Sequence, residues 1–190
     1  IYCLDTYGLS SCTYIDADLF FFSDPVILVK ELRVNESVII TDHRYTPKYD
    51  QTAISGKHCV QFVYFKNDEQ GRKVLDWWNE VCIEWCYNRF EDNKFGDQKY
   101  LDDWCNRFEG VHELEHLGGG VAHWNVQQYS FVTENGSVKG NVNDTNEVFE
   151  VVFYHFHNLK YCEMNTFLLD DYDISSDALQ NLYMPYVIEL

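Results

Sequence analysis

Short runs of β-branched and aromatic residues recur along the chain and predict the strands of an α/β fold. The first run begins at Thr13, reads as a buried strand, and ends in Asp16-Ala17-Asp18, which three consecutive phenylalanines follow. Further strands are expected at residues 36–41, 59–65, 111–116 and 148–156. Helical segments separate these runs. We therefore expect residues 1–190 to form a single α/β domain with a mixed central sheet flanked by helices.

A helical period is clearest between Asn67 and Phe90, where apolar residues recur at steps of three and four. These positions predict one core-facing side of a long helix. Asn67 is the expected N-cap, and Gln70 stands where it completes a capping box. Shorter helices are expected at residues 25–32, 96–108 and 177–183, with the last ending near Pro185.

Turn-forming residues fill the remaining segments. Residues 42–55 are polar and predict a loop, and Asn135-Gly136 predicts a turn within a polar hairpin or loop at residues 131–147. Gly118, Gly119 and Gly120 would allow the backbone to approach a ligand closely, and a plain turn explains them equally well.

The carboxylates of Asp16 and Asp18 are the strongest candidates for chemistry. Side chains alternate along a strand, so these two should share a face while Ala17 points away. Two oxygen ligands at a strand end suit Mg²⁺ or Mn²⁺ and leave room for a phosphate-bearing substrate. Asp-X-Asp also arises by chance among 31 acidic residues. Charge beside three phenylalanines, however, is unfavourable unless a cation or hydrogen-bond donors compensate it, which favours a metal site.

His155 and His157 are the second candidate. Both fall on one face if the strand at 148–156 continues through them. Neutral imidazole is a good ligand for Mn²⁺, and Lys160 is near enough in sequence to neutralise a phosphate. A hydrogen-bonded histidine pair explains the same pattern equally well.

Asp97 and Gln98 open the helix expected at 96–108, on its core side. An aspartate that caps the helix or complements its dipole is the simpler interpretation of Asp97 when it is taken alone.

Composition limits the classes of partner. The chain has 46% hydrophobic and 17% aromatic residues, enough for a substantial core. Its net charge of −17 argues against nucleic acid or an anionic membrane surface as the main partner. Seven cysteines without a Cys-X-X-Cys pair favour a reducing, cytoplasmic compartment. No signal peptide or transmembrane run is visible in the sequence.

A resemblance emerges from segments that occur in a specific order. They read Tyr-Ile-Asp-Ala-Asp-Leu-Phe-Phe-Phe-Ser-Asp-Pro, Phe-Val-Tyr-Phe-Lys-Asn, Gly-Asp-Gln-Lys-Tyr-Leu-Asp and Tyr-His-Phe-His-Asn-Leu-Lys. Together they resemble the GT-A glycosyltransferases of the group that contains glycogenin and bacterial lipopolysaccharide galactosyltransferases. The resemblance covers about residues 13–160, and the ordered set is more specific than any single motif.

The resemblance implies a GT-A-like domain that binds a nucleotide-diphospho-sugar, with a UDP-sugar favoured, and a glycan or lipid-linked glycan acceptor. It implies that Asp16, Asp18 and His155 hold Mn²⁺ or Mg²⁺ against the donor diphosphate, where the ion stabilises the leaving group. Ala17, between the two carboxylates, and Lys160 complete the implied donor-binding set.

Other roles follow from the same resemblance. Asp97 and Gln98 match an Asp-Gln pair that lies beside the transferred sugar, which makes them the implied catalytic residues. Gln61 is a weaker match to a polar residue facing the sugar or the acceptor. The resemblance also implies that a hexose is transferred with retention of its anomeric configuration.

The sequence departs from this group at three points. Asn158 stands where the group commonly has glycine, and no Pro-Trp follows Lys160. The group also begins with a βαβ half that binds the base and ribose of the donor. Twelve residues precede Thr13 here, so we expect part of that nucleotide-binding half to be missing.

Two rival functions stay open. In phosphohydrolases of the haloacid dehalogenase type, an apolar strand also ends in Asp-X-Asp; Asp16 would attack phosphorus and Asp18 would protonate the leaving group. Lys160 and Asp170-Asp171 would complete that site, but Phe20 replaces the expected Thr or Val. The Gly-Asp-Gln and His-Phe-His segments would also have no role. The other rival is a non-catalytic remnant of a glycosyltransferase.

Overall fold

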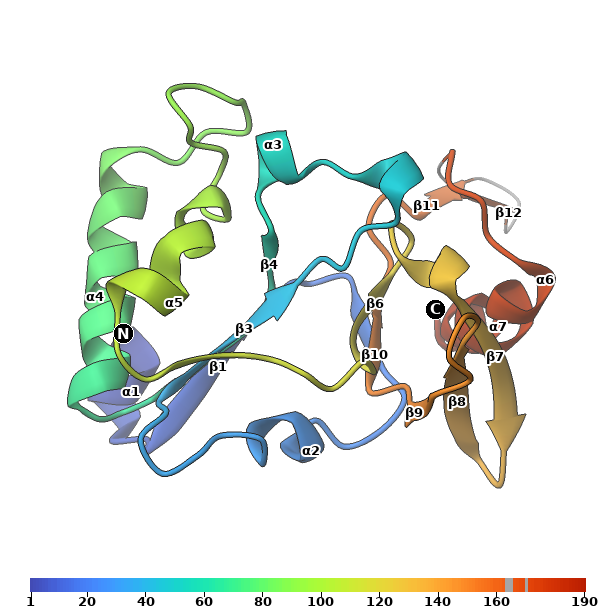
Figure 1. The fold of residues 1–190 in the computed structure, drawn as a ribbon, viewed down its shortest axis with the longest axis horizontal. Helices are drawn as coiled ribbons and strands as arrows, with labels where there is room; N and C mark the ends of the chain where they lie inside the picture. Colours follow the sequence, from blue (N-terminus) through green and yellow to red (C-terminus); the bar gives the residue numbers. More distant parts are fainter. Residues whose placement is uncertain (163–165, 170) are drawn as a thin grey trace. The chain divides into compact units, whose positions relative to one another are not determined.

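The computed structural model describes residues 1–162, 166–169 and 171–190. The chain forms two compact units, each with its own hydrophobic core. The first unit comprises Ile1–Asp16, Val26–His43 and Gln51–Glu115, and the second comprises Ala17–Pro25, Arg44–Asp50 and His116–Leu190. Both contain helices and small sheets, which confirms the predicted α/β class (Figure 1). The expected single GT-A-like domain stays a prediction.

The first unit is built on a mixed four-stranded sheet. Its strands, in sheet order, are β1 (Ser11–Ile15), β4 (His58–Lys66), β3 (Val38–Asp42) and β5 (Val111–Glu113). Strand β4 is antiparallel to both neighbours, and β3 and β5 are parallel. All of β4 except Lys66 is buried, including the polar residues His58 and Gln61, as expected for an inner strand of mainly apolar residues.

Strand β1 corrects one expectation. It is an outer strand of this sheet, and Tyr14 and Ile15 are 40% and 48% exposed, so the prediction of a buried strand is wrong. β-branched and aromatic residues favour the extended conformation at an edge as well as inside a sheet, so composition alone does not distinguish the two positions.

Helix α4 (Glu69–Glu84) packs on the sheet through Val74, Leu75 and Trp78. Its N-cap is Asp68, whose carboxylate accepts from Gly71 N at 2.9 Å, so the prediction of Asn67 is wrong by one position. The helix also ends before the predicted Phe90, because Trp85 is extended and Tyr100 Oη donates to the Trp85 carbonyl at 2.8 Å.

The remaining helices of the first unit are short. They are α1 (Tyr2–Tyr7), α2 (Val26–Val29), α3 (Thr52–Ser55), the 3₁₀ turn η2 (Lys99–Asp103) and α5 (Trp104–Arg107). The single helix expected at 96–108 is therefore a turn followed by η2 and α5, although Leu101 and Trp104 are fully buried as its period predicts.

The part of the second unit that the structure describes contains three small sheets. In the first sheet the strand order is β2 (Leu19–Phe21), β10 (Phe153–His155), β6 (Gly119–Ala122). In the second it is β7 (Tyr129–Glu134), β8 (Ser137–Val142), β9 (Val148–Glu150). The third sheet pairs β11 (Lys160–Cys162) with β12 (Thr166–Leu168). The β7–β8 hairpin turns at Asn135-Gly136, where φ is 50° and 82°, which confirms that prediction (Figure 1). The 3₁₀ turn η1 (Pro47–Tyr49) also belongs to this unit. The segment 42–55, which was expected to be a loop, therefore contains two short helical turns, η1 here and α3 in the first unit.

The single strand predicted at 148–156 is instead two strands in different sheets. Val151 N donates to Val138 O, whereas Val152 N donates to Gly118 O, so the chain changes hydrogen-bond partner between β9 and β10. Gly118 permits this close approach, because a Cβ there would lie 1.8 Å from the Glu150 carbonyl oxygen. The contact made by Gly118 is therefore with the protein's own backbone.

The chain ends in helical turns that continue past Pro185. They are α6 (Ser176–Ala178), the π-helical η5 (Leu179–Tyr183) and α7 (Met184–Glu189). The prediction of an end near Pro185 is wrong, because Pro185 lies in the first turn of α7, where a missing N–H is tolerated. Within the described residues, none of the helices is both long and apolar enough to cross a membrane.

Candidate metal site

Asp18 and His155, far apart in sequence, come together in the second unit. Strand β10 pairs antiparallel with β2 so that His155 lies opposite Leu19, and Phe156 N donates to the Asp18 carbonyl at 2.9 Å. This ladder places Asp18 Oδ1 3.0 Å from His155 Nε2. The pairing of β2 with β10 therefore joins the Asp-X-Asp and His-X-His segments.

His157 belongs to the same group. One carboxylate oxygen of Asp18 and one ring nitrogen each of His155 and His157 all lie within 4.8 Å of one another. Strand β10 ends at His155, so a shared strand face is not the cause of this proximity. His157 lies in the following turn, where Asn158 has a φ of 63°.

The Asp-X-Asp motif also differs from its prediction. Strand β1 ends at Ile15, and Ala17 and Asp18 form a turn before β2. The alternation of strand side chains therefore does not apply to Asp16 and Asp18. The chain passes from the first unit to the second between Asp16 and Ala17, so Asp16 is described with the first unit.

The Asp18 carboxylate is held in its ionised form. Its hydrogen bond with His155 lowers the pKa of Asp18, and the charge interactions with His155 and His157 act in the same direction, while partial burial opposes them. The Asp18 side chain is 41% exposed, whereas that of His155 is 5% exposed. An ionised, accessible carboxylate beside a buried imidazole is suited to binding a cation.

Aromatic rings support the two imidazoles. Trp124 contacts His155 edge to face with ring centroids 5.2 Å apart, and His157 stacks on His123 at 5.5 Å and 15°. His123 also contacts Tyr172, with centroids 4.0 Å apart. His123 and Trp124 reach this position because they follow β6, which pairs parallel with β10 and places Ala122 beside His155.

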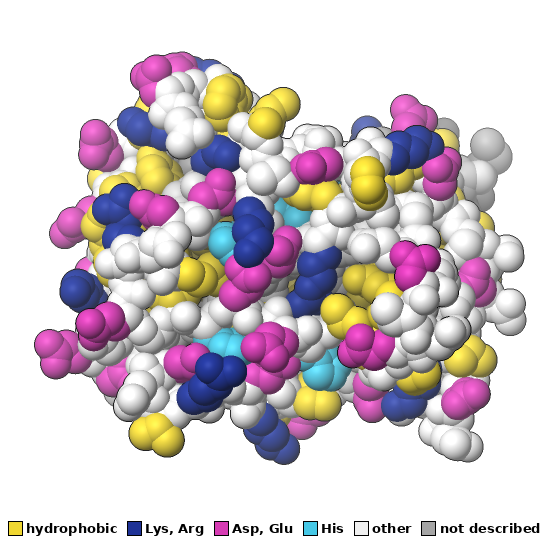
Figure 2. All heavy atoms as spheres, viewed as in Figure 1, with side chains coloured by type: hydrophobic (Ala, Val, Ile, Leu, Met, Phe, Trp, Pro, Cys, Tyr) yellow, Lys and Arg dark blue, Asp and Glu magenta, His cyan; other side chains and the backbone are white. Residues whose placement is uncertain are grey.

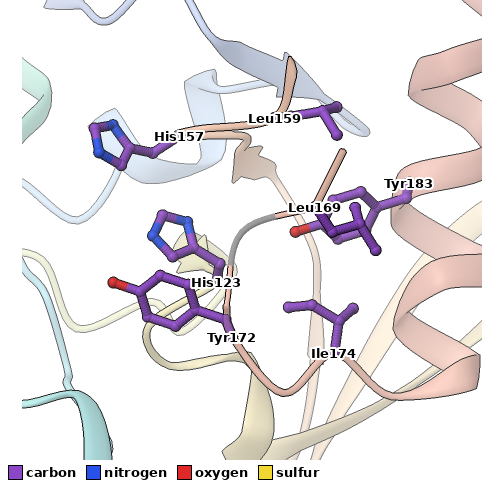
Figure 3. Close-up of a pocket in the computed structure, with 7 residues that line it drawn as sticks. All are labelled: His123, His157, Leu159, Leu169, Tyr172, Ile174 and Tyr183. Atoms are coloured by element: carbon purple, nitrogen blue, oxygen red, sulfur yellow. The ribbon is translucent and has the colours of Figure 1, made fainter. Parts of the chain in front are cut away.

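A small cavity adjoins this cluster. Its lining includes the imidazoles of His123 and His157 on one side and apolar side chains on the other, as Figure 3 shows. The lining residues are His123, His157, Leu159, Leu169, Tyr172, Ile174 and Tyr183. Its volume of about 10 Å³ accommodates a single water molecule, so it is too small for a sugar or a nucleotide.

The donor set fits a divalent ion. One carboxylate and two imidazoles converge, and this combination binds first-row metals such as Mn²⁺ while leaving positions for other oxygen ligands. The opening of this set to solvent through Asp18 and the exposed His157 would allow a phosphate to approach.

The predicted catalytic residues Asp97 and Gln98 belong to the first unit. Burial raises the pKa of Asp97, and the charge of Asp16 raises it further. Gln98 Nε2 donates to the Ser55 carbonyl at 2.9 Å, which fixes its side chain. Gln98, not Asp97, is the N-cap of η2, so helix capping does not explain Asp97.

Tyr14 is a neighbour of these carboxylates that we did not single out from the sequence. Its hydroxyl donates to Asp16 Oδ1 at 3.1 Å. Burial raises the pKa of Tyr14, and the charges of Asp16 and Asp97 contribute in the same direction. Tyr14 and Asp16 are two positions apart, and this spacing is the feature of the sequence that could have indicated their contact. Gln61 is fully buried on β4, and its carbonyl accepts from Asp16 N at 3.1 Å.

Lys160 follows the His-X-His segment. It begins β11, where it is exposed and pairs with Leu168 across the ladder. Of the pair proposed for a phosphohydrolase, Asp170 lies outside the described residues, and Asp171 is exposed. Elsewhere, Asp and Glu side chains are spread over the face seen in Figure 2, with Lys and Arg among them.

The fold and the site thus define a mixed α/β protein with a candidate divalent-metal site of one carboxylate and two imidazoles. No family model matches the chain. It is 32% identical over 185 residues to the uncharacterized protein YfnD of Bacillus subtilis (strain 168), covering 93% of this chain and 56% of YfnD. It is 30% identical over 163 residues to the uncharacterized protein YfnF of the same strain, covering 83% of this chain and 52% of YfnF. The chain therefore spans about half the length of these curated relatives.

Proposed function

We propose that the chain is a GT-A-type, metal-dependent glycosyltransferase that moves a sugar from a nucleotide-diphospho-sugar to a glycan or lipid-linked glycan acceptor. The observation that carries the proposal is the 3.0 Å approach of Asp18 Oδ1 to His155 Nε2. These residues come from the first and the last of the ordered segments that resemble the glycosyltransferase group, and the resemblance assigns both to one metal ion. Nothing in the local sequence requires them to meet.

The residues of the second unit would hold the ion in a definite way. Asp18 offers an ionised oxygen, because its pKa is lowered, and His155 offers a ring nitrogen from a buried and packed imidazole. When bound, Mn²⁺ or Mg²⁺ would supply Lewis-acid stabilisation of the leaving nucleoside diphosphate. Asp16, Lys160 and the retaining outcome rest on the resemblance alone.

Asp97 and Gln98 are proposed to lie beside the transferred sugar. Gln98 is held by the Ser55 carbonyl, which leaves its side-chain oxygen available to accept from a sugar hydroxyl. The raised pKa of Asp97 favours a carboxyl that can share a proton with such a hydroxyl. Both features suit positioning of a polyhydroxylated substrate.

The electrostatics of Asp18 disfavour the phosphohydrolase. In that mechanism Asp18 must be protonated to act as a general acid, and such a role calls for a raised pKa. The hydrogen bond from His155 lowers the pKa of Asp18 instead. A carboxylate held ionised is better suited to ligate a metal than to donate a proton.

The test is calorimetric titration of Mn²⁺ into the protein, with and without UDP, for the wild type and Asp18→Ala. We expect Mn²⁺ binding that UDP strengthens, and loss of both effects in Asp18→Ala. Asp144→Asn removes one carboxylate from an exposed turn of the same unit and should bind as the wild type does. Mn²⁺ binding without coupling to UDP or another nucleoside diphosphate would contradict the proposal. Coupling would justify a screen for hydrolysis of nucleotide-sugar donors.

A further inference from the structure

We propose that His157 is a ligand of the same metal ion, and that the resulting set of one carboxylate and two imidazoles selects Mn²⁺ over Mg²⁺. The inference deepens the proposed function, on which it rests for the presence of a metal at Asp18. It assigns a role to a histidine that the resemblance leaves without one, and it narrows the choice between the two ions.

Geometry supports coordination by three residues of one unit. Ligand atoms bound about 2.1 Å from one ion lie about 3 Å apart when adjacent and about 4.2 Å apart when opposite. Asp18 Oδ1 and His155 Nε2 are 3.0 Å apart, a hydrogen-bond distance that also matches the spacing of adjacent ligands, so a bound ion would replace the shared proton. A nitrogen of His157 lies within 4.8 Å of the ligand atoms of both residues, so small side-chain rotations complete the set.

The His157 ring is held although the residue is exposed. It stacks on His123 with centroids 5.5 Å apart and 15° between planes, and it meets His155 edge to face at 5.8 Å. His123 is itself only 2% exposed, and Figure 3 shows both imidazoles on the same side of the pocket. A ligand whose orientation is already limited loses less conformational entropy when it binds an ion.

The chemistry of the donor set determines the selectivity. Mg²⁺ prefers oxygen ligands in an octahedral arrangement and retains several water molecules. Imidazole nitrogen instead favours transition metals, whose affinities for such sites rise from Mn²⁺ onward in the first row. If Asp18 and His155 alone supplied the unit's ligands, the set would contain one nitrogen; His157 adds a second. We therefore expect Mn²⁺ to bind more tightly than Mg²⁺.

The experiment compares the wild type with His157→Ala and with the matched control Asn158→Gly. Asn158 lies in the same turn, and its φ of 63° suits glycine, so the control should fold and bind metal normally. Mn²⁺ is the appropriate probe because the chain has seven free cysteines, which would compete for softer ions. Titration calorimetry with Mn²⁺ and Mg²⁺ gives affinities, and pulsed EPR of bound Mn²⁺ detects coupling to imidazole nitrogen.

We expect His157→Ala to weaken Mn²⁺ binding by about 10-fold or more, to leave Mg²⁺ binding nearly unchanged and to reduce the nitrogen coupling. Asn158→Gly should retain the wild-type affinity and the full nitrogen coupling. His157→Gln, which keeps a polar side chain, should lose the same coupling. Unchanged Mn²⁺ affinity and nitrogen coupling in His157→Ala would overturn the inference, as would a wild-type preference for Mg²⁺.

The same titrations distinguish this inference from the proposed function. Loss of Mn²⁺ affinity in His157→Ala without any UDP coupling in the wild type would support the ligand assignment and contradict the transferase. UDP-coupled Mn²⁺ binding that is equal in the wild type and His157→Ala would support the transferase and overturn the assignment.

Discussion

Two carboxylates in different units of the molecule experience opposite environments. Asp18, in the second unit, accepts from His155, and this interaction lowers its pKa. Asp97, in the first unit, is partly buried near Asp16, and burial together with that second carboxylate raises its pKa. The charged form of the same functional group is therefore stabilised in one unit and destabilised in the other, relative to an aspartate in water.

The difference separates two chemical roles. A carboxylate that stays ionised beside imidazoles can ligate a cation, whereas one with a raised pKa can hold or share a proton. Asp18 precedes Leu19 and three phenylalanines, whereas Asp97 lies between Gly96 and Gln98, and neither local sequence predicts this contrast. Their neighbours in three dimensions determine it, so substitutions at those neighbours and at the carboxylates themselves test the comparison.

The largest expected effect comes from His155→Ala. Removing this imidazole removes one proposed ligand and the hydrogen bond that lowers the pKa of Asp18. We expect Mn²⁺ affinity to fall by about 100-fold or more, since the loss of a direct ligand should exceed the 10-fold to 100-fold effect of losing an outer hydrogen bond. The pKa of Asp18, followed by carbon NMR of its carboxyl group in metal-free buffer, should rise.

Asp97→Asn is the matched comparison for that experiment. Like His155→Ala, it changes a side chain that interacts with an aspartate. Here that aspartate is Asp16, in the first unit. It should leave the titration of Asp18 unchanged. If Asp97→Asn shifts the pKa of Asp18 as much as His155→Ala does, the proposed separation of the two environments is wrong.

A smaller effect is expected on the stability of Asp97→Asn. Because the folded-state pKa of Asp97 is raised, the folded protein binds more protons than the unfolded chain between the ordinary and the raised pKa. Asp97 therefore lowers stability progressively as pH rises through that window, and the loss is complete above it. Asn carries no charge, so the variant should be more stable at pH 7 by about 1 kcal/mol or less.

The pH dependence of this stability difference shows whether the charge of Asp97 causes it. Below the ordinary pKa of 3.8, Asp97 is protonated in both states, so the stability gained by Asp97→Asn should disappear there. Urea unfolding in metal-free buffer at pH 7 and at the lowest pH where the wild type folds measures the two values. A gain that persists unchanged at low pH would show that packing, not charge, distinguishes the two side chains.

Much of the first unit could be predicted from the sequence. Strand β4 is apolar apart from His58, Gln61 and Lys66, because the sheet buries both of its faces. Val74, Leu75 and Trp78 recur at helical spacing because α4 packs on that sheet. The position of β1 at the edge could not be predicted, because Tyr14 and Ile15 are apolar and yet half exposed. Strand order depends on non-local pairing that composition does not encode.

The site shows the same division between local and non-local information. Asp18 and His155 could be selected from their motifs and from the resemblance, but His123 and Trp124 could not. Their rings reach the imidazoles only because β6 and β10 are parallel neighbours and end at the same edge. Likewise, His157 was selected on the assumption of a strand, whereas a turn after β10 brings it to Asp18.

The smallest effect is expected from Tyr14→Phe. This change measures how much the neutral hydroxyl that donates to Asp16 contributes to stability, for comparison with the imidazole that donates to Asp18. The change removes the hydrogen bond to Asp16 but keeps the ring that contacts Trp78 edge to face at 5.7 Å. Tyr14 is 40% exposed, so we expect a loss of about 0.5 kcal/mol. Both pH 6 and pH 9 lie below the ordinary tyrosine pKa of 10.0, so the loss measured by urea unfolding should be equal at these two values. Because the pKa of Tyr14 is raised in the folded protein, the loss should shrink above pH 10, where the unfolded chain ionises first. A loss that stays the same above pH 10 would contradict the raised pKa, and with it the influence of the first-unit carboxylates on this hydroxyl.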